Sequence, residues 1–338
     1  MRIVVVGFGT VGQSFCNVLH ERRRELIAKY GLNPKVVAIS DTGGVAADET
    51  GLDIPKVLGL KKARKSVAAL DGKGYKKKTG LEAIEENEAE VVVEATPTNI
   101  VTGEPGISHI EKAFKLRRNV ITVNKGPLAL AFPALMELAR YNGVMLKFSG
   151  TVGGGTPILE FGKRCLEADK ILAIRGILNG TTNYILTEMD EKGISFNEGL
   201  ASAQKLGYAE ANPSLDVDGL DSAAKCVIMA NFLVGIDATI RDVNVRGIRD
   251  VTPRDIEKAK ASGAAVKLVA SIDGKLSVTP VELKRSDPMC VGGALNSVKF
   301  ISQYAGEEVI VGKGAGGTET ASAILRDLLE IRNSISVV

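Results

Sequence analysis

Four charged side chains near the middle of the chain have the types and spacing needed for proton transfer. Glu210, Asp216, Asp221 and Lys225 fall within sixteen residues. A carboxylate beside an amine can carry a proton to or from a substrate oxygen, and each group shifts the ionisation of the other. The alternatives are structural: Asp218 could cap a helix, and Asp221 with Lys225 could be an exposed ion pair worth about 0.3 kcal/mol.

The segment around these residues is expected to contain two helices joined by a turn. Gly207 suits the position after a helix C-terminus, because glycine adopts a positive φ without a steric penalty. The Asn-Pro pair at 212–213 indicates a turn. Apolar residues at helical spacing place a second helix from about Gly219 onward. On that helix Asp221 and Lys225 lie four residues apart and share one face.

The composition is that of a globular protein with balanced charge. The chain has 338 residues, of which 43 are basic and 40 acidic, and 45% are hydrophobic; this length allows two domains with sizeable cores. A net charge of +3 does not indicate nucleic acid as a partner. The lysine-rich stretches 61–65 and 76–78 are interpreted as solvated surface, and contact of one lysine with a cofactor phosphate is the alternative.

Metal sites and histidine-based catalysis have few candidate residues. The chain has two histidines and four cysteines, with no C-x-x-C pair. Cys16 and Cys226 fall within apolar helical patterns and are predicted to be buried thiols, so neither a disulfide framework nor a zinc site is expected. The sequence shows no signal-peptide pattern and no apolar run of about 18 residues. It therefore predicts a cytoplasmic protein without a membrane partner.

The first residues of the chain predict a dinucleotide site. A β-branched run at 2–6 leads directly into a glycine-rich loop, and a helical pattern follows. Strand, G-x-G-x-x-G and helix in this order form the Rossmann fingerprint, whose glycines allow a tight turn and close approach of a pyrophosphate. The backbone N–H groups of the helix N-terminus would hold the phosphates. The loop residues predicted to bind the cofactor are Gly7, Phe8, Gly9, Thr10, Val11 and Gly12.

Three further residues follow predicted strands and should come to the ligand edge of the sheet. Asp41 follows the strand 36–40, where a carboxylate would accept the ribose hydroxyls of NAD and repel a 2′-phosphate. NADP stays open, because the glycines beyond Asp41 could hold that phosphate together with a lysine. Thr96 and Lys125 follow two later apolar strands. A surface loop lysine is the alternative for Lys125.

Two loop segments open the second half of the chain. Residues 149–157 are rich in glycine and are interpreted as a hinge between domains, the alternative being a loop whose carbonyl groups bind a hard cation. Residues 179–183 follow a strand and offer small polar groups to a small molecule. A helix N-cap formed by Thr181 or Thr182 is the alternative there. Four strands within 266–311 then predict an α+β layer.

A second glycine-rich turn at 312–318 precedes a predicted helix over 319–332. We expect this helix to return to the N-terminal domain and to bring Gly316 close to the nicotinamide. The predicted fold class is α/β. An N-terminal Rossmann dinucleotide-binding domain would span 1–148, completed by 312–338, and an α+β domain for substrate binding and oligomerisation would span 149–311.

Several stretches, taken in order, resemble the homoserine dehydrogenase family. They are the G-x-G-x-x-G loop, T-V-N-K at 122–125, G-I-L-N-G-T-T-N-Y at 176–184, the segment 203–225 and the turn at 314–321. The resemblance covers essentially the whole chain and includes no regulatory ACT domain. It implies NAD(P)-dependent interconversion of L-homoserine and L-aspartate 4-semialdehyde, a step towards threonine and methionine.

The resemblance also implies roles for individual residues. Glu210 would bind the ammonium group of the amino-acid substrate. Asp216 and Asp221 would help to hold substrate and water. Lys225 would donate the proton to the developing alkoxide, and Lys125 would face substrate and cofactor and share in the proton transfer. The residues that would line the pocket are Thr181, Gly207 and Tyr208, with Gly207 and Gly316 also near the cofactor.

Other expectations from the resemblance concern a cation and the assembly. A monovalent cation, Na⁺ or K⁺, would be held partly by carbonyl groups of Val152 and Gly154, although Ser149 stands where the family places a supporting glutamate. A homodimer or homotetramer would form through the second domain. Aspartate-semialdehyde dehydrogenase is an alternative that requires a nucleophilic cysteine near a histidine, and Cys290 has no such motif beside it. A non-catalytic NAD(H)-binding sensor is the other alternative, and no basic recognition helix supports it.

Overall fold

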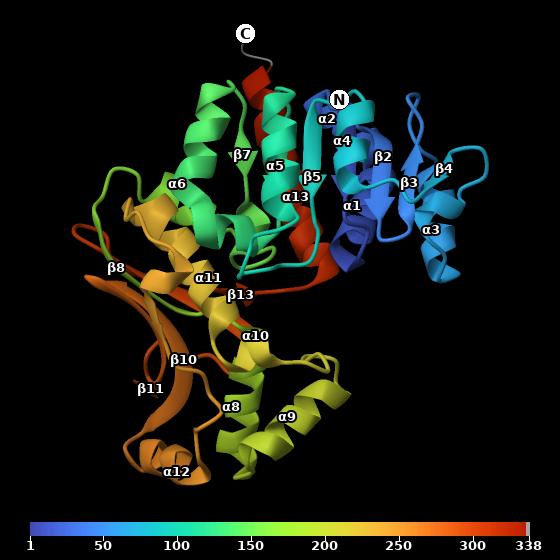
Figure 1. The fold of residues 1–338 in the computed structure, drawn as a ribbon. Helices are drawn as coiled ribbons and strands as arrows, with labels where there is room; N and C mark the ends of the chain where they lie inside the picture. The colour runs from blue at the N-terminus through green and yellow to red at the C-terminus, as the bar shows by residue number, and fades with distance from the viewer. Residues whose placement is uncertain (336–338) are drawn as a thin grey trace. The chain divides into compact units, whose positions relative to one another are not determined.

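The computed structural model describes residues 1–335, which form two units (Figure 1). The first unit comprises residues 1–151 and the C-terminal segment from Gly316 onward, and the second comprises Val152–Ala315. Residues 336–338, the end of the segment predicted to complete the first domain, lie outside the described residues. The chain crosses between the units within its two glycine-rich segments.

A seven-stranded sheet forms the centre of the first unit, in the order β4-β3-β2-β1-β5-β6-β7. Its strands are β1 (Arg2–Val6), β2 (Lys35–Asp41), β3 (Gly44–Ala47), β4 (Gly74–Lys76), β5 (Val91–Glu94), β6 (Asn119–Thr122) and β7 (Leu146–Lys147). Five of them run parallel, whereas β3 and β4 add an antiparallel edge. Strands β1 and β5 are buried almost throughout, as expected of parallel strands that carry helices on both faces.

Helices cover both faces of this sheet (Figure 1). They are α1 (Thr10–Glu21), α2 (Arg23–Tyr30), α3 (Ile54–Lys62), α4 (Gly80–Glu86), α5 (Gly106–Lys115), α6 (Lys125–Tyr141) and α13 (Gly317–Ile335). Helix α5 packs between α4 and α6, and α1 packs against α13. The core beneath α1 and α13 includes Phe15, Leu19, Ile324 and Leu328, and each such side chain stabilises the fold by about 1.5–3 kcal/mol. The C-terminal helix is therefore part of the core of the first unit.

The second unit is built on a six-stranded sheet in the order β13-β12-β8-β10-β11-β9. Its strands are β8 (Ile171–Ile177), β9 (Val243–Val245), β10 (Ala264–Asp273), β11 (Lys275–Lys284), β12 (Leu295–Ser302) and β13 (Gly306–Lys313). Its helices are α7 (Ile158–Glu160), α8 (Gly180–Lys192), α9 (Phe196–Lys205), α10 (Ser214–Val217), α11 (Leu220–Met229) and α12 (Pro253–Ala261). All strand pairs except β9–β11 are antiparallel. A Rossmann-like parallel sheet and a second sheet domain confirm the predicted α/β class.

The structure corrects several elements expected from the sequence. Strands β3 and β4 were not anticipated, because both begin at glycines that lie against neighbouring backbone and no alternating pattern marks them. A Cβ on Gly74 would be 2.2 Å from the Ala68 carbonyl oxygen. The apolar residues within 144–148 predict a strand, but β7 contains only Leu146 and Lys147, and a 3₁₀ turn at Ser149–Thr151 follows. The sequence also predicts a helix over 158–166, where the structure has one α-turn that continues as a π-helical turn over Phe161–Cys165.

The predicted buried thiols are confirmed. Cys16 and Cys226 are buried free cysteines. Burial raises the pKa of Cys226 to about 12, and it also raises the pKa of Cys16, so both behave as small apolar side chains. Within residues 1–335, none of the helices has the length and apolar character needed to cross a membrane.

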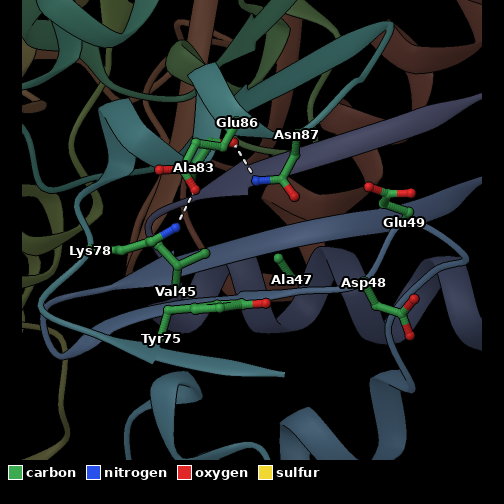
Figure 2. A pocket seen from close by; sticks show the side chains of 9 residues that line it. All are labelled: Val45, Ala47, Asp48, Glu49, Tyr75, Lys78, Ala83, Glu86 and Asn87. Carbon is green, nitrogen blue, oxygen red and sulfur yellow. Dashed lines mark hydrogen bonds and ion pairs between the residues drawn. The ribbon is translucent and has the colours of Figure 1, made fainter. Parts of the chain in front are cut away.

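A cavity of about 290 Å³ lies beside the antiparallel edge of the first sheet (Figure 2). Its lining residues are Val45, Ala47, Asp48, Glu49, Tyr75, Lys78, Ala83, Glu86 and Asn87. Lys78 pairs with Glu86, and its Nζ lies 4.7 Å from the centroid of the Tyr75 ring. Asp48 pairs with Lys73. None of the residues predicted to bind cofactor or substrate lines this cavity, so we place the active site elsewhere.

Candidate active site

The glycine-rich loop after β1 has the shape that a dinucleotide requires. Gly7 has φ +94°, and a Cβ on it would be 2.5 Å from the carbonyl carbon of Ala95 at the end of β5. A Cβ on Gly12 would be 2.3 Å from the carbonyl oxygen of Gly7. In contrast, a Cβ on Gly9 would meet no atom within 4 Å. The first and third glycines therefore allow close packing, and the second keeps the backbone approachable.

The first turn of α1 is suited to an anion. Its N-cap is Gly9, and no side chain caps the helix, so the N–H groups of the first turn point outward. Phe8 is 2% exposed and Val11 packs against the core. These two loop residues therefore offer backbone groups rather than side chains to a ligand.

The start of α13 lies against the same loop. A Cβ on Gly317 would be 2.5 Å from Ser14 Oγ and 2.9 Å from Thr10 Cγ2. Gly316, just before it, has φ +134°, a conformation that favours glycine. The structure thus brings Gly316 to the N-terminal end of α1, beside the loop that is predicted to bind the cofactor.

Asp41 ends β2 and is bound more tightly by the protein than its predicted role suggests. Its carboxylate accepts hydrogen bonds from Lys61 Nζ at 2.8 Å and from Ser66 Oγ at 2.6 Å. The backbone N–H groups of Gly43 and Val67 donate at 2.9 and 3.1 Å. Four donors use the four acceptor positions of a carboxylate. A ribose hydroxyl would therefore have to replace one of them.

The charge of Asp41 is stabilised at the same time. Burial is the largest influence and opposes ionisation, but the hydrogen bonds from Lys61, Ser66 and the two backbone groups together outweigh it and hold the pKa of Asp41 below its usual value. The interpretation of Lys61 as solvated surface is wrong, because its side chain is 23% exposed and paired with Asp41. The lysine-rich stretch instead supplies a positive charge beside the predicted ribose position.

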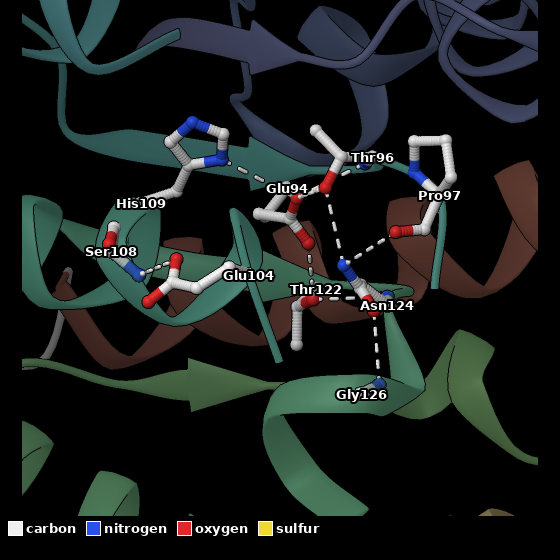
Figure 3. A network of polar contacts seen from close by, with 9 residues as sticks. All are labelled: Glu94, Thr96, Pro97, Glu104, Ser108, His109, Thr122, Asn124 and Gly126. Atoms are coloured by element: carbon white, nitrogen blue, oxygen red, sulfur yellow. Dashed lines mark hydrogen bonds and ion pairs between the residues drawn. The ribbon is translucent and has the colours of Figure 1, made fainter. Parts of the chain in front are cut away.

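A polar network connects the ends of β5 and β6 (Figure 3). Glu94 is completely buried and accepts hydrogen bonds from the hydroxyl and N–H of Thr96 and, at 3.1 Å, from Thr122 Oγ1. Asn124 Nδ2 donates to Thr96 Oγ1 at 3.2 Å. The Oδ1 of Asn124 accepts from Gly126 N and caps α6, whose first residue is Lys125. Thr96 and Lys125 are therefore placed along one sheet edge by a buried carboxylate.

In the second unit, Lys225 is held between a carboxylate and a carbonyl group. Its side chain is 7% exposed, and its Nζ lies 2.7 Å from Asp221 Oδ2. The same Nζ donates to the backbone carbonyl oxygen of Leu178 at 2.6 Å. The alternative of an exposed ion pair is wrong, because both partners are largely buried. Burial removes water from both charges, so the free energy of this ion pair depends on the hydrogen bonds that the protein provides in place of water.

Asn179 connects the two aspartates of this cluster. Its Nδ2 donates to Asp216 Oδ1 at 2.6 Å and to Asp221 Oδ2 at 3.0 Å. Its Oδ1 accepts from Thr182 N, so Asn179 rather than Thr181 or Thr182 is the N-cap of α8. Burial, followed by the charge of Asp221, raises the pKa of Asp216.

Asp218 does not cap the helix that follows it. The N-cap of α11 is Gly219, with φ +85° and no side-chain cap. Asp218 instead pairs with Arg249. Because Gly219 is the N-cap and the Asp218 carboxylate is paired with Arg249, the N-cap alternative for Asp218 is wrong.

The other residues predicted to bind substrate lie at or near the end of α9 in the sequence or contact that segment. Gly207 follows this helix with φ +78°, in the conformation predicted for it. Thr181 Oγ1 donates to the carbonyl oxygen of Tyr208 at 2.7 Å, and the rings of Tyr208 and Tyr184 are 4.8 Å apart. Glu210 is exposed, and its carboxylate forms no hydrogen bond or ion pair with a described residue.

Comparison with known proteins gives the family. The homoserine dehydrogenase family model matches residues 157–329. A homoserine dehydrogenase of Methanocaldococcus jannaschii is 44% identical over 335 residues and covers 99% of each chain. The chain belongs to the homoserine dehydrogenase family. An NAD(+)-dependent homoserine dehydrogenase of Pseudomonas canavaninivorans is 37% identical, covering 98% of this chain and 96% of the relative.

Solved structures agree with this membership of the homoserine dehydrogenase family. A putative homoserine dehydrogenase from Archaeoglobus fulgidus has a TM-score of 0.89 at 38% identity and covers 98% of this chain and 99% of that one. A hyperthermophilic archaeal homoserine dehydrogenase in complex with NADPH has a TM-score of 0.86 at 28% identity and covers 98% of both chains. Residues 1–116 also match the model of the glutamate/leucine/phenylalanine/valine dehydrogenases. The comparisons do not favour aspartate-semialdehyde dehydrogenase.

The contacts by which two asparagines, Asn179 and Asn124, hold the predicted site residues were not anticipated from the sequence. Asn179 and Asn124 each cap a helix and also bind the neighbouring site residues. Asparagine directly after an apolar strand and before a helix is a recognisable N-cap signal. The second function of each side chain depends on residues more than twenty positions away, which local patterns do not reveal.

The loop predicted to hold a cation shows close backbone packing. Gly154 has φ +57°, and a Cβ on it would be 3.1 Å from the carbonyl carbon of Gly314. Val152 is fully buried. Ser149 binds Asp327 through its backbone N–H and its hydroxyl. Among residues 1–335, no three His, Cys, Asp or Glu side chains are grouped to hold a metal ion.

Proposed function

We propose that this chain interconverts L-homoserine and L-aspartate 4-semialdehyde with NAD or NADP, using Lys225 as the proton donor and acceptor. The observation that supports the role of Lys225 is its ammonium group, held by Asp221 and by the Leu178 carbonyl in a largely buried position. An ammonium group has three N–H bonds. With two directed at these partners, the third is available for the substrate oxygen.

The proton transfer follows from this geometry. When bound, the nicotinamide supplies or accepts the hydride at the substrate carbon. In aldehyde reduction, Lys225 stabilises the negative charge that develops on the oxygen and gives it a proton, and the amine formed regains a proton from solvent. In alcohol oxidation, the neutral amine takes the hydroxyl proton. A positioned acid or base of this kind contributes about 10²- to 10⁴-fold to the rate.

The neighbouring residues would bind the amino-acid part of the substrate. Glu210 is exposed near the Thr181–Tyr208 contact, and its carboxylate suits the substrate ammonium. Asp216 and Asp221, joined by Asn179, would orient substrate and water. Lys125 would provide a second cation toward the substrate and share in the proton transfer.

The dinucleotide would bind to the first unit. The approachable Gly9 and the uncapped first turn of α1 fit a pyrophosphate. The Asp41–Lys61 pair fits either cofactor, because a ribose hydroxyl can replace one of the four donors on the carboxylate and a 2′-phosphate can approach the lysine. One relative is named NAD(+)-dependent and another is solved with NADPH. We propose that this chain uses NAD or NADP and that the Asp41–Lys61 pair sets the ratio.

The remaining proposals concern the setting of the enzyme. A homodimer or homotetramer formed through the second unit, a cytoplasmic location and a role in threonine and methionine biosynthesis follow from the family. A monovalent cation at the carbonyl groups of Val152 and Gly154 stays a prediction.

The test is the oxidation of L-homoserine, followed by the near-ultraviolet absorbance of the reduced nicotinamide. NAD⁺ and NADP⁺ are supplied separately, and we expect reduction of at least one. Aspartate 4-semialdehyde with NADH or NADPH tests the reverse direction. Failure of the purified chain in both directions, with demonstrated cofactor binding, would contradict the proposed reaction and favour a non-catalytic binder.

A further inference from the structure

Asn296 is connected to Lys225 through a single carbonyl group. It lies in β12, is 2% exposed, and donates from Nδ2 to the Leu178 carbonyl oxygen at 2.8 Å. Lys225 Nζ donates to the same oxygen at 2.6 Å. The amide and the ammonium thus share one acceptor, and together they use both of its lone pairs.

Gly314 packs directly against the Asn296 amide. A Cβ on Gly314 would be 1.8 Å from Nδ2 and 2.1 Å from Cγ of Asn296. A substituted residue at 314 would therefore push the amide away from Leu178. Gly314 is not among the glycines with positive φ, so close approach rather than backbone conformation requires glycine here.

The orientation of the amide is fixed by Leu178. A reversed amide would bring its oxygen against the Leu178 carbonyl oxygen, which cannot donate a hydrogen bond. In the observed orientation, the Asn296 Oδ1 is buried and has no hydrogen-bond partner among residues 1–335. A buried amide that leaves its oxygen unsatisfied requires an explanation. The hydrogen bond that Asn296 Nδ2 donates to the Leu178 carbonyl, beside Lys225, supplies one.

We infer that Asn296 is a positioning residue for Lys225 and that Gly314 keeps Asn296 in place. Leu178 lies between the end of β8 and the Asn179 cap of α8, so its carbonyl is held from the sheet side by Asn296. A carbonyl held in this way fixes one of the two contacts of Lys225 Nζ, while Asp221 provides the other. This inference rests on the proposed role of Lys225, and it gives the second glycine-rich turn a function in the chemistry.

The test is a double-mutant cycle of Asn296→Ala and Gly314→Ala in the full chain. Misplacement of a reacting group by about 1 Å can lower the rate about 10²-fold, so we expect each single variant to lower kcat for homoserine oxidation by about 10- to 100-fold. The Kd for NADH or NADPH should change by less than about twofold. Because Gly314→Ala acts by displacing the Asn296 amide, it should lower kcat by less than about threefold when added to Asn296→Ala.

Gly292→Ala is the matched control, because a Cβ there would meet its nearest atom, in Thr187, at 3.6 Å. It should leave kcat unchanged. A kcat near that of the unmodified chain in either Asn296→Ala or Gly314→Ala, or single effects that multiply in the double variant, would overturn the inference. Thermal unfolding shows whether each variant is folded. If Asn296→Ala is not folded, the kcat of Gly314→Ala alone tests the inference. Lys225→Ala distinguishes failure of this inference from failure of the proposed function. Normal turnover by Lys225→Ala would contradict the proposed function itself.

Discussion

Glu210 differs from the other charged residues of the site because the protein leaves its carboxylate exposed. Asp216, Asp221 and Lys225 contact one another or Asn179. Among residues 1–335, by contrast, Glu210 accepts a hydrogen bond through its backbone carbonyl alone, from Gln204. An exposed carboxylate that has no partner in the described part of the chain is available for a substrate cation. Its contribution should therefore be to binding rather than to the chemical step.

Glu210→Ala should raise KM for L-homoserine about 10- to 100-fold while kcat changes little, because a hydrogen bond to a charged group is worth about 1.5–3 kcal/mol. Steady-state kinetics with a saturating cofactor measures both constants. Glu191→Ala, also at an exposed glutamate of the second unit, is the control. An unchanged KM would count against ammonium binding by Glu210.

Asp41 offers a test of cofactor choice at a single atom. Asp41→Asn keeps the size of the side chain, removes its charge, and leaves Lys61 without its ionic partner. A 2′-phosphate should then be accepted more readily, and the ratio of kcat/KM with NADP⁺ to that with NAD⁺ should rise about tenfold, which corresponds to about 1.4 kcal/mol. The two values are measured with L-homoserine. A constant ratio would show that Asp41 does not read the ribose.

At the scale of elements, the short helix α10 and the first turn of α11 bring two carboxylates to one asparagine. Asp216 and Asp221 both accept from Asn179 Nδ2. Burial and the like charge of Asp221 raise the pKa of Asp216, so its ionised form destabilises the folded state. Holding two acids side by side therefore lowers the free energy of unfolding. Groups with shifted pKa values of this kind are common at functional sites.

Asp216→Asn should increase the free energy of unfolding at neutral pH while lowering activity, because it removes a buried charge that lies beside Asp221. The folded-state pKa of Asp216 lies above the unfolded value, so the unmodified chain carries this destabilisation above the folded-state pKa and loses it as the pH falls toward the unfolded value. The difference in the free energy of unfolding between Asp216→Asn and the unmodified chain should therefore become smaller at acidic pH. Urea unfolding at neutral and acidic pH measures it, and a less stable variant at neutral pH would contradict this reading.

The sequence predicted the elements with strong patterns and missed those that depend on distant partners. The strand at 2–6, its glycine loop and the helix after it are confirmed, because β-branched runs and G-x-G-x-x-G are local signals. The edge strands β3 and β4 have no such signal. The pairing of Lys61 with Asp41 spans twenty residues. A lysine-rich stretch is interpreted as solvated surface when the acidic partner of one of its lysines is not known. Fixed side-chain partners were thus harder to predict than backbone elements.

In the whole molecule, the residues that we propose for the reaction belong to both units. The glycine loop, Asp41, Thr96 and Lys125 belong to the first unit, and the Lys225 cluster belongs to the second. Each unit has its own sheet, and α13 returns the chain to the core of the first. A family resemblance across the whole length indicated both halves of the chemistry, whereas composition alone indicated only a globular protein.

Proton transfer by Lys225 is tested directly by measuring kcat for L-homoserine oxidation in the Lys225→Met variant. Methionine keeps much of the length and volume of the side chain and removes the amine. We expect kcat to fall about 10²- to 10⁴-fold, with the Kd for NADH or NADPH unchanged. Lys205→Met, at an exposed lysine of α9, should retain full activity. Turnover by Lys225→Met close to that of the unmodified chain would contradict the account.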